Sequence, residues 1–226
     1  VANEVREVAA AQGIAVTESA SIQATAGRHR VSSAGIRHRD GAGERIACDL
    51  VAMAGGFTPT LHLFSQLRGK LAWNELRQTL LATESRAHVH LAGACAGSDG
   101  LLRALEDGAA AGEIAARAAG KVGPGRLRAT VEGGDGPQAV AAPDAMAPPT
   151  KGRAFVDFQN DVTTKDLQLA AREGFRSVEH VKRYTTTGMA TDQGKTGNVN
   201  ALGVVSHALG QGIGALGHTT FRAPCT

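Results

Sequence analysis

Hydrophobic and polar positions repeat with helical spacing in the region 151–210, and this pattern predicts three short helices. Thr163, with Asp166 three residues later, forms a capping pair that predicts the start of the first helix. Ser177 predicts the start of the second helix, and the third is expected to begin near Asn198. Leucine, valine and alanine give the helices an apolar side, and the loops between them are rich in hydroxyls, amides and glycine. We expect a small all-α domain here.

The first 122 residues show a different pattern, in which short apolar runs alternate with helical segments. A helix is predicted over residues 1–12, and a long alanine-rich helix over residues 101–119. Strands are predicted at Ile14–Val16, Ser21–Ala24, Arg30–Ile36, Arg45–Ala47, Cys48–Ala54 and His88–Ala92. The last two run into glycines, as buried strands of a parallel sheet do where backbone must approach closely. This alternation is typical of an α/β region.

Proline and glycine separate these two regions. Residues 123–150 hold most of the prolines and no sustained apolar period, which predicts a linker. Residues 211–226 are glycine-rich at first and are expected to begin a second linker. The expected organisation is an α/β region at 1–122, a linker at 123–150, a helical domain at 151–210 and the start of another linker. Because the chain lacks an initiator methionine and ends abruptly, we expect it to be a piece of a longer polypeptide.

Composition excludes several classes of protein. The chain has 226 residues, of which 42% are hydrophobic but only 4% aromatic, and its formal charge of +3 is small. The basic residues are scattered without interleaved aromatic residues, so no nucleic-acid partner is expected. No apolar run reaches the roughly 18 residues of a membrane span and no signal peptide is evident, so no membrane is expected either. Three distant cysteines favour a reducing cytoplasm over a disulfide scaffold.

The histidines and cysteines do not predict a metal site. His88 and His90 share one face of the predicted strand, but no third ligand lies near them in the sequence, so a surface pair is expected. Cys48 is interpreted as a small core residue.

A resemblance adds to this interpretation. The run SVEHVKRYTTTGMATDQGKTGNVNA, residues 177–201, closely resembles a segment in the alpha subunit of heterotetrameric sarcosine oxidase. In that family the segment follows a nucleotide-binding region and precedes a folate-binding domain. The resemblance implies an α/β fold that is part of a two-dinucleotide-domain, glutathione-reductase-like fold, followed by a small all-α three-helix domain.

The three-helix pattern also resembles the bacterioferritin-associated-ferredoxin-like domain, which elsewhere holds a two-iron cluster on four cysteines. Near those four places this chain has Asp157, Gln159, Asp192 and Gly197. Thiolates are needed to hold such a cluster, and the chain has none between Cys95 and Cys225. The sequence therefore predicts a domain of this kind without an iron–sulfur cluster.

For the α/β region, the resemblance implies NAD as cofactor. Flavoprotein oxidoreductases usually have Gly-Asp where this chain has Gly93-Ala94, which argues against FAD. By resemblance, Ala96, Leu101 and Arg103 face the dinucleotide, at the start of the long helix. The alternative, that this is only strand–helix packing, stays open. Because the chain lacks the G-x-G-x-x-G fingerprint, we expect it to bind NAD weakly or not at all by itself.

For the helical domain, the resemblance implies one wall of an FMN site. Sarcosine oxidase demethylates sarcosine to glycine with hydrogen peroxide, and passes the one-carbon unit to tetrahydrofolate. Its FAD belongs to the beta subunit and its FMN to the alpha–beta interface, so no residue of this segment is expected to be catalytic. The candidates for the FMN wall combine hydroxyls, an amide and a cation: Thr185, Thr186, Gln193, Lys195 and Thr196. The alternative, that they cap helices, stays open.

Two other functions remain open. The chain could be a non-catalytic module that serves only as a docking surface for the beta subunit. It could also belong to a related amine or opine dehydrogenase, although the helical domain of that type would be expected to keep its cysteines. The resemblance implies the beta subunit and smaller subunits as partners.

Overall fold

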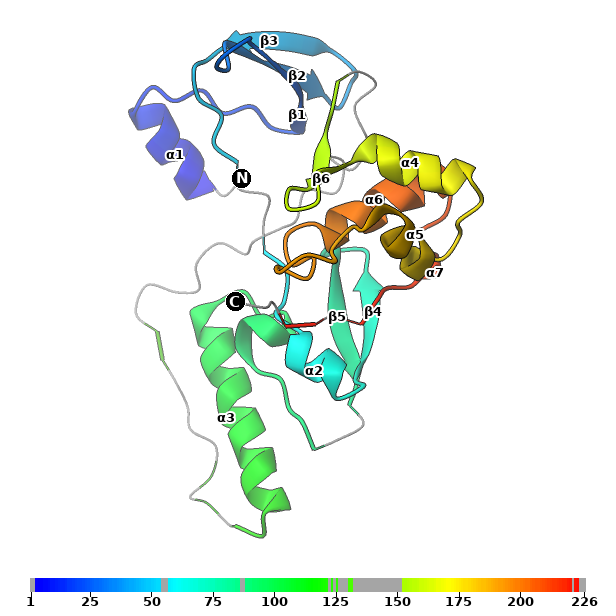
Figure 1. Cartoon of the computed structure of the whole chain (residues 1–226). Coiled ribbons are helices and arrows are strands. Elements are labelled where there is room, and N and C mark those ends of the chain that lie inside the picture. Colours follow the sequence, from blue (N-terminus) through cyan, green and yellow to red (C-terminus); the bar gives the residue numbers. More distant parts are fainter. Residues whose placement is uncertain are drawn as a thin grey trace. The chain divides into compact units, whose positions relative to one another are not determined.

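The computed structural model describes residues 3–53, 57–85, 88–121, 123, 125, 130–131, 152–220 and 222–223. It is a mixed fold of helices and strands, whose elements are labelled in Figure 1. Contacts divide the chain into two compact units, residues 1–55 with 147–152, and residues 56–146 with 153–226. The predicted linker at 123–150 lies almost entirely outside the described residues, so the domain boundaries of the sequence analysis stay predictions.

The first unit consists of one helix and a three-stranded antiparallel sheet. Its elements are α1 (Asn3–Ala11), β1 (Ala20–Ala26), β2 (Ser33–His38) and β3 (Gly43–Ala47). Each strand pairs with the next one along the chain, in the order β1-β2-β3. The predicted helix and these three strands are confirmed, although β2 begins at Ser33 rather than at Arg30.

Two predicted strands of the first unit are wrong. Residues 14–16 and 48–53 have no strand structure, and the Gly55-Gly56 pair lies outside the described residues. The side chain of Ile14 is 57% exposed and that of Met53 is 81% exposed. Cys48 is only half-buried. A buried strand needs a neighbour on each side, and the described strands of this unit pair only in the antiparallel meander. Apolar runs without such neighbours stay irregular.

The first half of the second unit consists of a short helix, a β-hairpin, a 3₁₀ helix and a long helix. Its elements up to this point are α2 (His62–Gln66), β4 (Lys70–Asn74), β5 (Thr79–Glu84), the 3₁₀ helix η1 (Gly93–Ala96) and α3 (Leu101–Ala118). The prediction of α3 is confirmed, whereas α2 and the hairpin were not predicted. The strand predicted at 88–92 is wrong, because these residues are irregular and lead into η1. Val89 and Leu91 nevertheless pack on a small core of Leu61, Phe64 and Leu71.

The second half of this unit is the helical region. Its elements are β6 (Phe155–Asp157), β7 (Val162–Thr163), α4 (Thr164–Arg172), α5 (Val178–Thr185), α6 (Asn198–Leu209) and α7 (Ile213–Leu216). The three predicted helices are confirmed, with Thr163 and Ser177 as the N-caps of α4 and α5. The strands β6 and β7 pair antiparallel, as do all the strand pairs among the described residues. A parallel sheet is therefore not formed within the described part of the chain.

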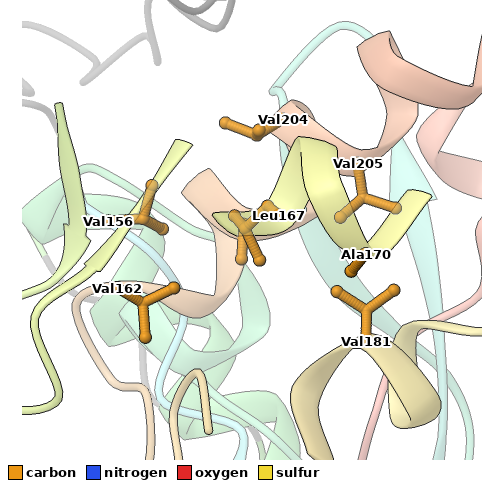
Figure 2. Close-up of a cluster of buried hydrophobic side chains, with 8 residues drawn as sticks. Val156, Val162, Leu167, Ala170, Val181, Val204 and Val205 are labelled. Carbon is orange, nitrogen blue, oxygen red and sulfur yellow. The ribbon is translucent and has the colours of Figure 1, made fainter. Parts of the chain in front are cut away.

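The core of the helical region is built around α4. Leu167 is completely buried, and Figure 2 shows it between the valines of β6 and β7 on one side and those of α5 and α6 on the other. The cluster consists of Val156, Val162, Leu167, Ala170, Val181, Ala201, Val204 and Val205. A second cluster joins Leu80 of the β4–β5 hairpin to Val178 and Leu202. The hairpin is therefore packed against the helical region.

A capping box starts α4. The backbone N–H of Thr163 donates to Asp166 Oδ2 over 2.8 Å, and the Thr163 hydroxyl donates to the same oxygen over 2.6 Å. These bonds from the Thr163 side chain and backbone hold the pKa of Asp166 below its usual value. A depressed carboxyl pKa means that the ionised form stabilises the folded state.

We expect Asp166→Asn to lower the free energy of unfolding by about 1 kcal/mol near pH 6, as loss of a helix cap does. The contribution of the ionised carboxylate is fully present above the unfolded-state pKa of about 3.9 and is lost as the pH falls through the lower folded-state pKa. Urea unfolding of the wild type and the variant from pH 6 to pH 2 measures this difference. The exposed Asp161→Asn is the control. A difference that grows as the pH falls contradicts this assignment.

Candidate functional site

Asp157 is the buried centre of the loops that follow β6 and α5. Its side chain is 6% exposed. Asp157 Oδ1 accepts the backbone N–H groups of Gln159 and Asn160, over 2.9 and 3.0 Å. Asp157 Oδ2 accepts the backbone N–H of Gly188 over 2.7 Å, from a loop 31 residues away. One carboxylate therefore ties the turn after β6 to the loop after α5.

Two further side chains join the same loops. The Gln159 Oε1 atom accepts the backbone N–H of Asp192 over 3.0 Å, and its Nε2 donates to Thr191 Oγ1 over 3.1 Å. The Asn160 amide donates to the carbonyl of Thr186 over 2.9 Å. Asp192 in turn accepts the N–H of Gly194 over 3.0 Å. The loop 186–196 is thus held at several points by hydrogen bonds from neighbouring turns.

Asn198, at the start of α6, lies inside this loop. A Cβ atom added to Gly188 or Gly194 would collide with the Asn198 side-chain oxygen, and both glycines have positive φ. The Asn198 amide also donates to the carbonyl of Gln193 over 3.2 Å. Glycine is therefore required at 188 and 194 both for backbone conformation and for space.

The four positions that replace cysteines by resemblance are part of this arrangement. Asp157, Gln159 and Asp192 make the hydrogen bonds described above. At the fourth position, a Cβ added to Gly197 would lie 2.6 Å from the carbonyl oxygen of Val156, a backbone atom that cannot easily move. Polar side chains and close backbone packing occupy the places where a cluster would need thiolates.

The five residues predicted for an FMN wall are brought together in this one loop system. Thr185 and Gln193 are half-buried; Thr185 donates to the carbonyl of Val181 within α5, and Gln193 donates to that of Ala190 within the loop. Thr186, Lys195 and Thr196 are exposed. Thr186 is also held in the left-handed conformation, with φ of 62°. The loop therefore exposes the Lys195 ammonium and two hydroxyls, which donate to the Thr185 carbonyl and to Asp192 Oδ2.

Lys195 lines a small pocket of about 40 Å³ beside the segment before α2. His62, Thr58 and Asn198 are among the other lining residues. Burial lowers the pKa of His62, and the nearby charge of Lys195 lowers it further. The sequence analysis did not single out His62, because only the tertiary fold brings it to the loop 194–199.

The residues predicted to face a dinucleotide lie at the junction of η1 and α3. Ala96 is half-buried at the end of η1, and Leu101 and Arg103 are exposed in the first turn of α3. Leu101 is 60% exposed. The N-cap of α3 is Gly100, which has no side chain to bond the first amides, and the first turn holds no acidic residue. These amides are oriented as in helix ends that bind anions.

Arg77, a residue not singled out in the sequence, supports this junction. Its guanidinium donates to the carbonyl of Gly97 and pairs with Asp99, which precedes α3. Ser98 donates to Asp107 within α3. The turn between η1 and α3 is therefore tied to the β4–β5 hairpin and to the helix that follows. No local sequence signal links residues 20 and 22 positions apart.

The predicted histidine pair is exposed at both His88 and His90. Among the described residues, no group of three or more histidine, cysteine, aspartate or glutamate side chains is arranged to hold a metal ion. Within the same residues, no helix is both long enough and apolar enough to span a membrane.

Comparisons with known proteins point to one family. Residues 151–226 match the family described as the sarcosine oxidase A3 domain. The chain is 45% identical over 185 residues to the sarcosine oxidase subunit alpha of Rhizobium meliloti (strain 1021), covering 82% of this chain and 19% of the relative. It is 40% identical over 191 residues to the subunit alpha of Corynebacterium sp. (strain P-1), covering 81% of this chain and 19% of that protein. The chain thus spans about a fifth of the length of these relatives.

A solved structure has a similar fold. The crystal structure of L-proline dehydrogenase from P. horikoshii superposes with a TM-score of 0.64 and 18% sequence identity. The match covers 99% of this chain and 46% of that chain. At this level of identity the likeness concerns the fold alone, and it agrees with a mixed α/β, dehydrogenase-like fold.

Proposed function

We propose, from the premise that this chain belongs to the sarcosine oxidase alpha-subunit family, that it forms one wall of an FMN site and part of an NAD site in an oxidoreductase complex. The FMN wall is the loop 185–196, and the complementary wall belongs to a beta subunit. The observation that carries this proposal is the loop itself, which Asp157 and Asn198 hold rigidly while it exposes hydroxyls and a cation.

The residues of the loop differ in whether they could contact a flavin phosphate or the edge of the flavin ring. Lys195 is exposed, and its ammonium is a donor of the kind that binds phosphate and carbonyl oxygens. The exposed hydroxyls of Thr186 and Thr196 donate to the Thr185 carbonyl and to Asp192 Oδ2, so they would exchange these bonds for a ligand oxygen. Thr185 donates to the carbonyl of Val181 in α5 and Gln193 to that of Ala190, so their role would be to shape the site. Bound FMN would supply electron transfer, and the chain's own residues would orient it.

The NAD half of the proposal rests on the start of α3. The first turn of α3 follows Gly100 and holds no acidic residue, and Arg103 adds a positive charge. Ala96 is small enough to let a ligand approach the end of η1. A ribose or phosphate group fits such a helix end. The dinucleotide fingerprint would come from another part of the full-length subunit.

The domain organisation belongs to the same proposal. Residues 1–122 would be part of a two-dinucleotide-domain fold, 123–150 a linker, 151–210 a helical domain without a cluster, and 211–226 the start of the connection to a folate-binding domain. The complex would act on the CH–NH bond of sarcosine, with tetrahydrofolate receiving the one-carbon unit and smaller subunits completing the assembly. The cysteine content favours the cytoplasm.

The test is the FMN content of a full-length alpha subunit that carries this segment, co-purified with a beta subunit. Lys195→Ala should weaken FMN retention about 10- to 100-fold in affinity, because a charge-assisted hydrogen bond contributes about 1.5–3 kcal/mol. Binding of the beta subunit should be unchanged. Lys165→Ala, an exposed lysine on α4, is the matched control. Unchanged FMN content in Lys195→Ala and in Thr186→Ala would remove the loop from the FMN site.

A docking module is the second candidate, and exposed apolar side chains favour it. Phe155 and Phe158 are 41% and 71% exposed, with ring centroids 6.4 Å apart, and Met189 is 53% exposed. Such residues are enriched at protein interfaces. If Phe158→Ser abolishes binding of the beta subunit while the Lys195 variant keeps its flavin, the segment is a docking surface and not a cofactor wall.

A further inference from the structure

A cationic pocket is lined by α5, by the loop that follows it and by the C-terminal residues Thr219, Thr220 and Arg222. Its volume is about 240 Å³. Lys182 and Arg183 of α5 line it together with Thr219 and Arg222, and Glu179 lies at its edge. Lys195, the cation of the proposed flavin wall, is not among the lining residues. Gly188, Met189 and Gln193 of the loop 185–196 do line it, so the pocket adjoins the proposed flavin wall.

The lining charges leave an excess of two positive charges. Glu179 is the only carboxylate among the lining residues, and it pairs with Arg183 over 3.5 Å. Lys182 and Arg222 then remain as cations of the pocket. None of the ion pairs found among the described residues contains either of them. Two cations that share one pocket repel each other unless an anion lies between them.

The environment of Lys182 supports this view. Its side chain is half-buried, and its ammonium lies 3.4 Å from the hydroxyl of Thr219, which is 6% exposed. Burial lowers the pKa of Lys182 most and the Arg222 charge lowers it further, whereas the carboxylates of Glu179, Asp157 and Asp192 raise it. An ammonium withdrawn from water beside another cation is stabilised when an anion enters.

We propose that this pocket binds the phosphate group of a phosphate ester. A phosphate monoester carries a charge of about −1.5 to −2 at pH 7, which matches the two cations in excess. Arginine offers a planar fork for two phosphate oxygens and lysine a compact point charge, and the Thr219 hydroxyl is a third polar group. The pocket is smaller than the roughly 300 Å³ at which sites for whole drug-sized ligands begin, which suits a phosphate group.

The pocket shares Gly188, Met189 and Gln193 with the loop of the proposed flavin wall, but its binding of phosphate is tested on Lys182 and Arg222, which lie outside that loop. The phosphate source is either free inorganic phosphate or the phosphate end of a larger molecule, and the chemistry recognised is the same. Because Lys195 lies outside the pocket, a failure of the Lys195 test and a failure of the present one are separate results.

The experiment is calorimetric titration of the complete chain with inorganic phosphate at low ionic strength. Lys182→Gln and Arg222→Gln should each weaken binding about tenfold or more, since each removes a charge-assisted contact. Lys165→Gln and Arg176→Gln, which remove exposed charges outside the pocket, should leave the affinity within about twofold. Circular dichroism checks that every variant is folded, and Arg222→Gln serves if the half-buried Lys182 cannot be replaced.

Parallel titrations with flavin mononucleotide and with riboflavin identify the source. Tighter binding of the phosphorylated flavin, lost in Lys182→Gln, supports the pocket as the seat of a flavin phosphate. If inorganic phosphate binds but the two flavins bind equally well, the pocket is a phosphate site whose ligand is a phosphate ester other than flavin mononucleotide. No phosphate binding by the folded wild type, or equal weakening by Lys182→Gln and Lys165→Gln, overturns the proposal.

Discussion

Asp157→Asn is expected to lower the free energy of unfolding of the helical region by about 3 kcal/mol, one of the two largest effects predicted here. The carboxylate is buried and accepts three backbone N–H groups, from Gln159, Asn160 and Gly188. An asparagine keeps one acceptor oxygen, but its amide nitrogen then faces a backbone donor. At least one buried N–H is left without a partner, and the charge that strengthened the other bonds is gone.

Urea unfolding at pH 7 measures this effect, followed by circular dichroism of the helices. Asp161→Asn is the matched control, because Asp161 is exposed four residues away. Its φ of 54° lies in the left-handed region, where asparagine is well tolerated. The control should therefore stay within about 0.5 kcal/mol of the wild type. Similar unfolding midpoints for the two variants would mean that the Asp157 bonds do not hold the loops.

Leu167→Ala is expected to cost about 3–4 kcal/mol of stability, because truncating a fully buried leucine loses apolar burial and leaves a cavity. Leu167 is completely buried at the centre of the cluster in Figure 2. Its neighbours come from two strands and three helices, so no single element can move in to fill the space.

The matched control is Leu169→Ala on the same helix, where the side chain is 38% exposed. It should cost less than about 1.5 kcal/mol, in proportion to the smaller area removed from contact. Denaturant unfolding of both variants gives the comparison, and an unchanged slope shows that the denatured state is the same. Equal losses at 167 and 169 would contradict the assignment of Leu167 as the centre of the core.

The helical region could be predicted because its signals are local. Thr163 and Asp166, three residues apart, form the capping box of α4, and Ser177 occupies the N-cap position of α5. The start of α6 was expected near Asn198 and is found at that residue. Capping depends on a few neighbouring residues and survives whatever the rest of the chain does. The same holds for the long alanine-rich helix α3, which needs no partner to be recognised.

Local patterns could not decide whether residues 48–54 and 88–92 form strands. An apolar run of five residues becomes a strand only if neighbouring strands supply its hydrogen bonds. In the described part of the chain, residues 48–53 and 88–92 have no such neighbours and are irregular. The β4–β5 hairpin was not predicted, although its turn is closed by a local bond, in which Arg77 N–H donates to Asn74 Oδ1 over 2.9 Å.

The composition of the candidate site could also be predicted from the sequence, whereas its arrangement could not. Sequence alone established that the loop 185–196 is rich in hydroxyls, amides and glycine, and that thiolates are absent from it. It also established the three helices that carry this loop, because caps and helical periodicity act over a few residues. Only the tertiary structure decided which groups the loop exposes. Asp157, Gln159 and Asn198 reach it from other turns, and Thr219 and Arg222 approach Lys182 from the end of the chain. Contacts between residues tens of positions apart depend on how the helices pack, and local sequence patterns do not predict that packing.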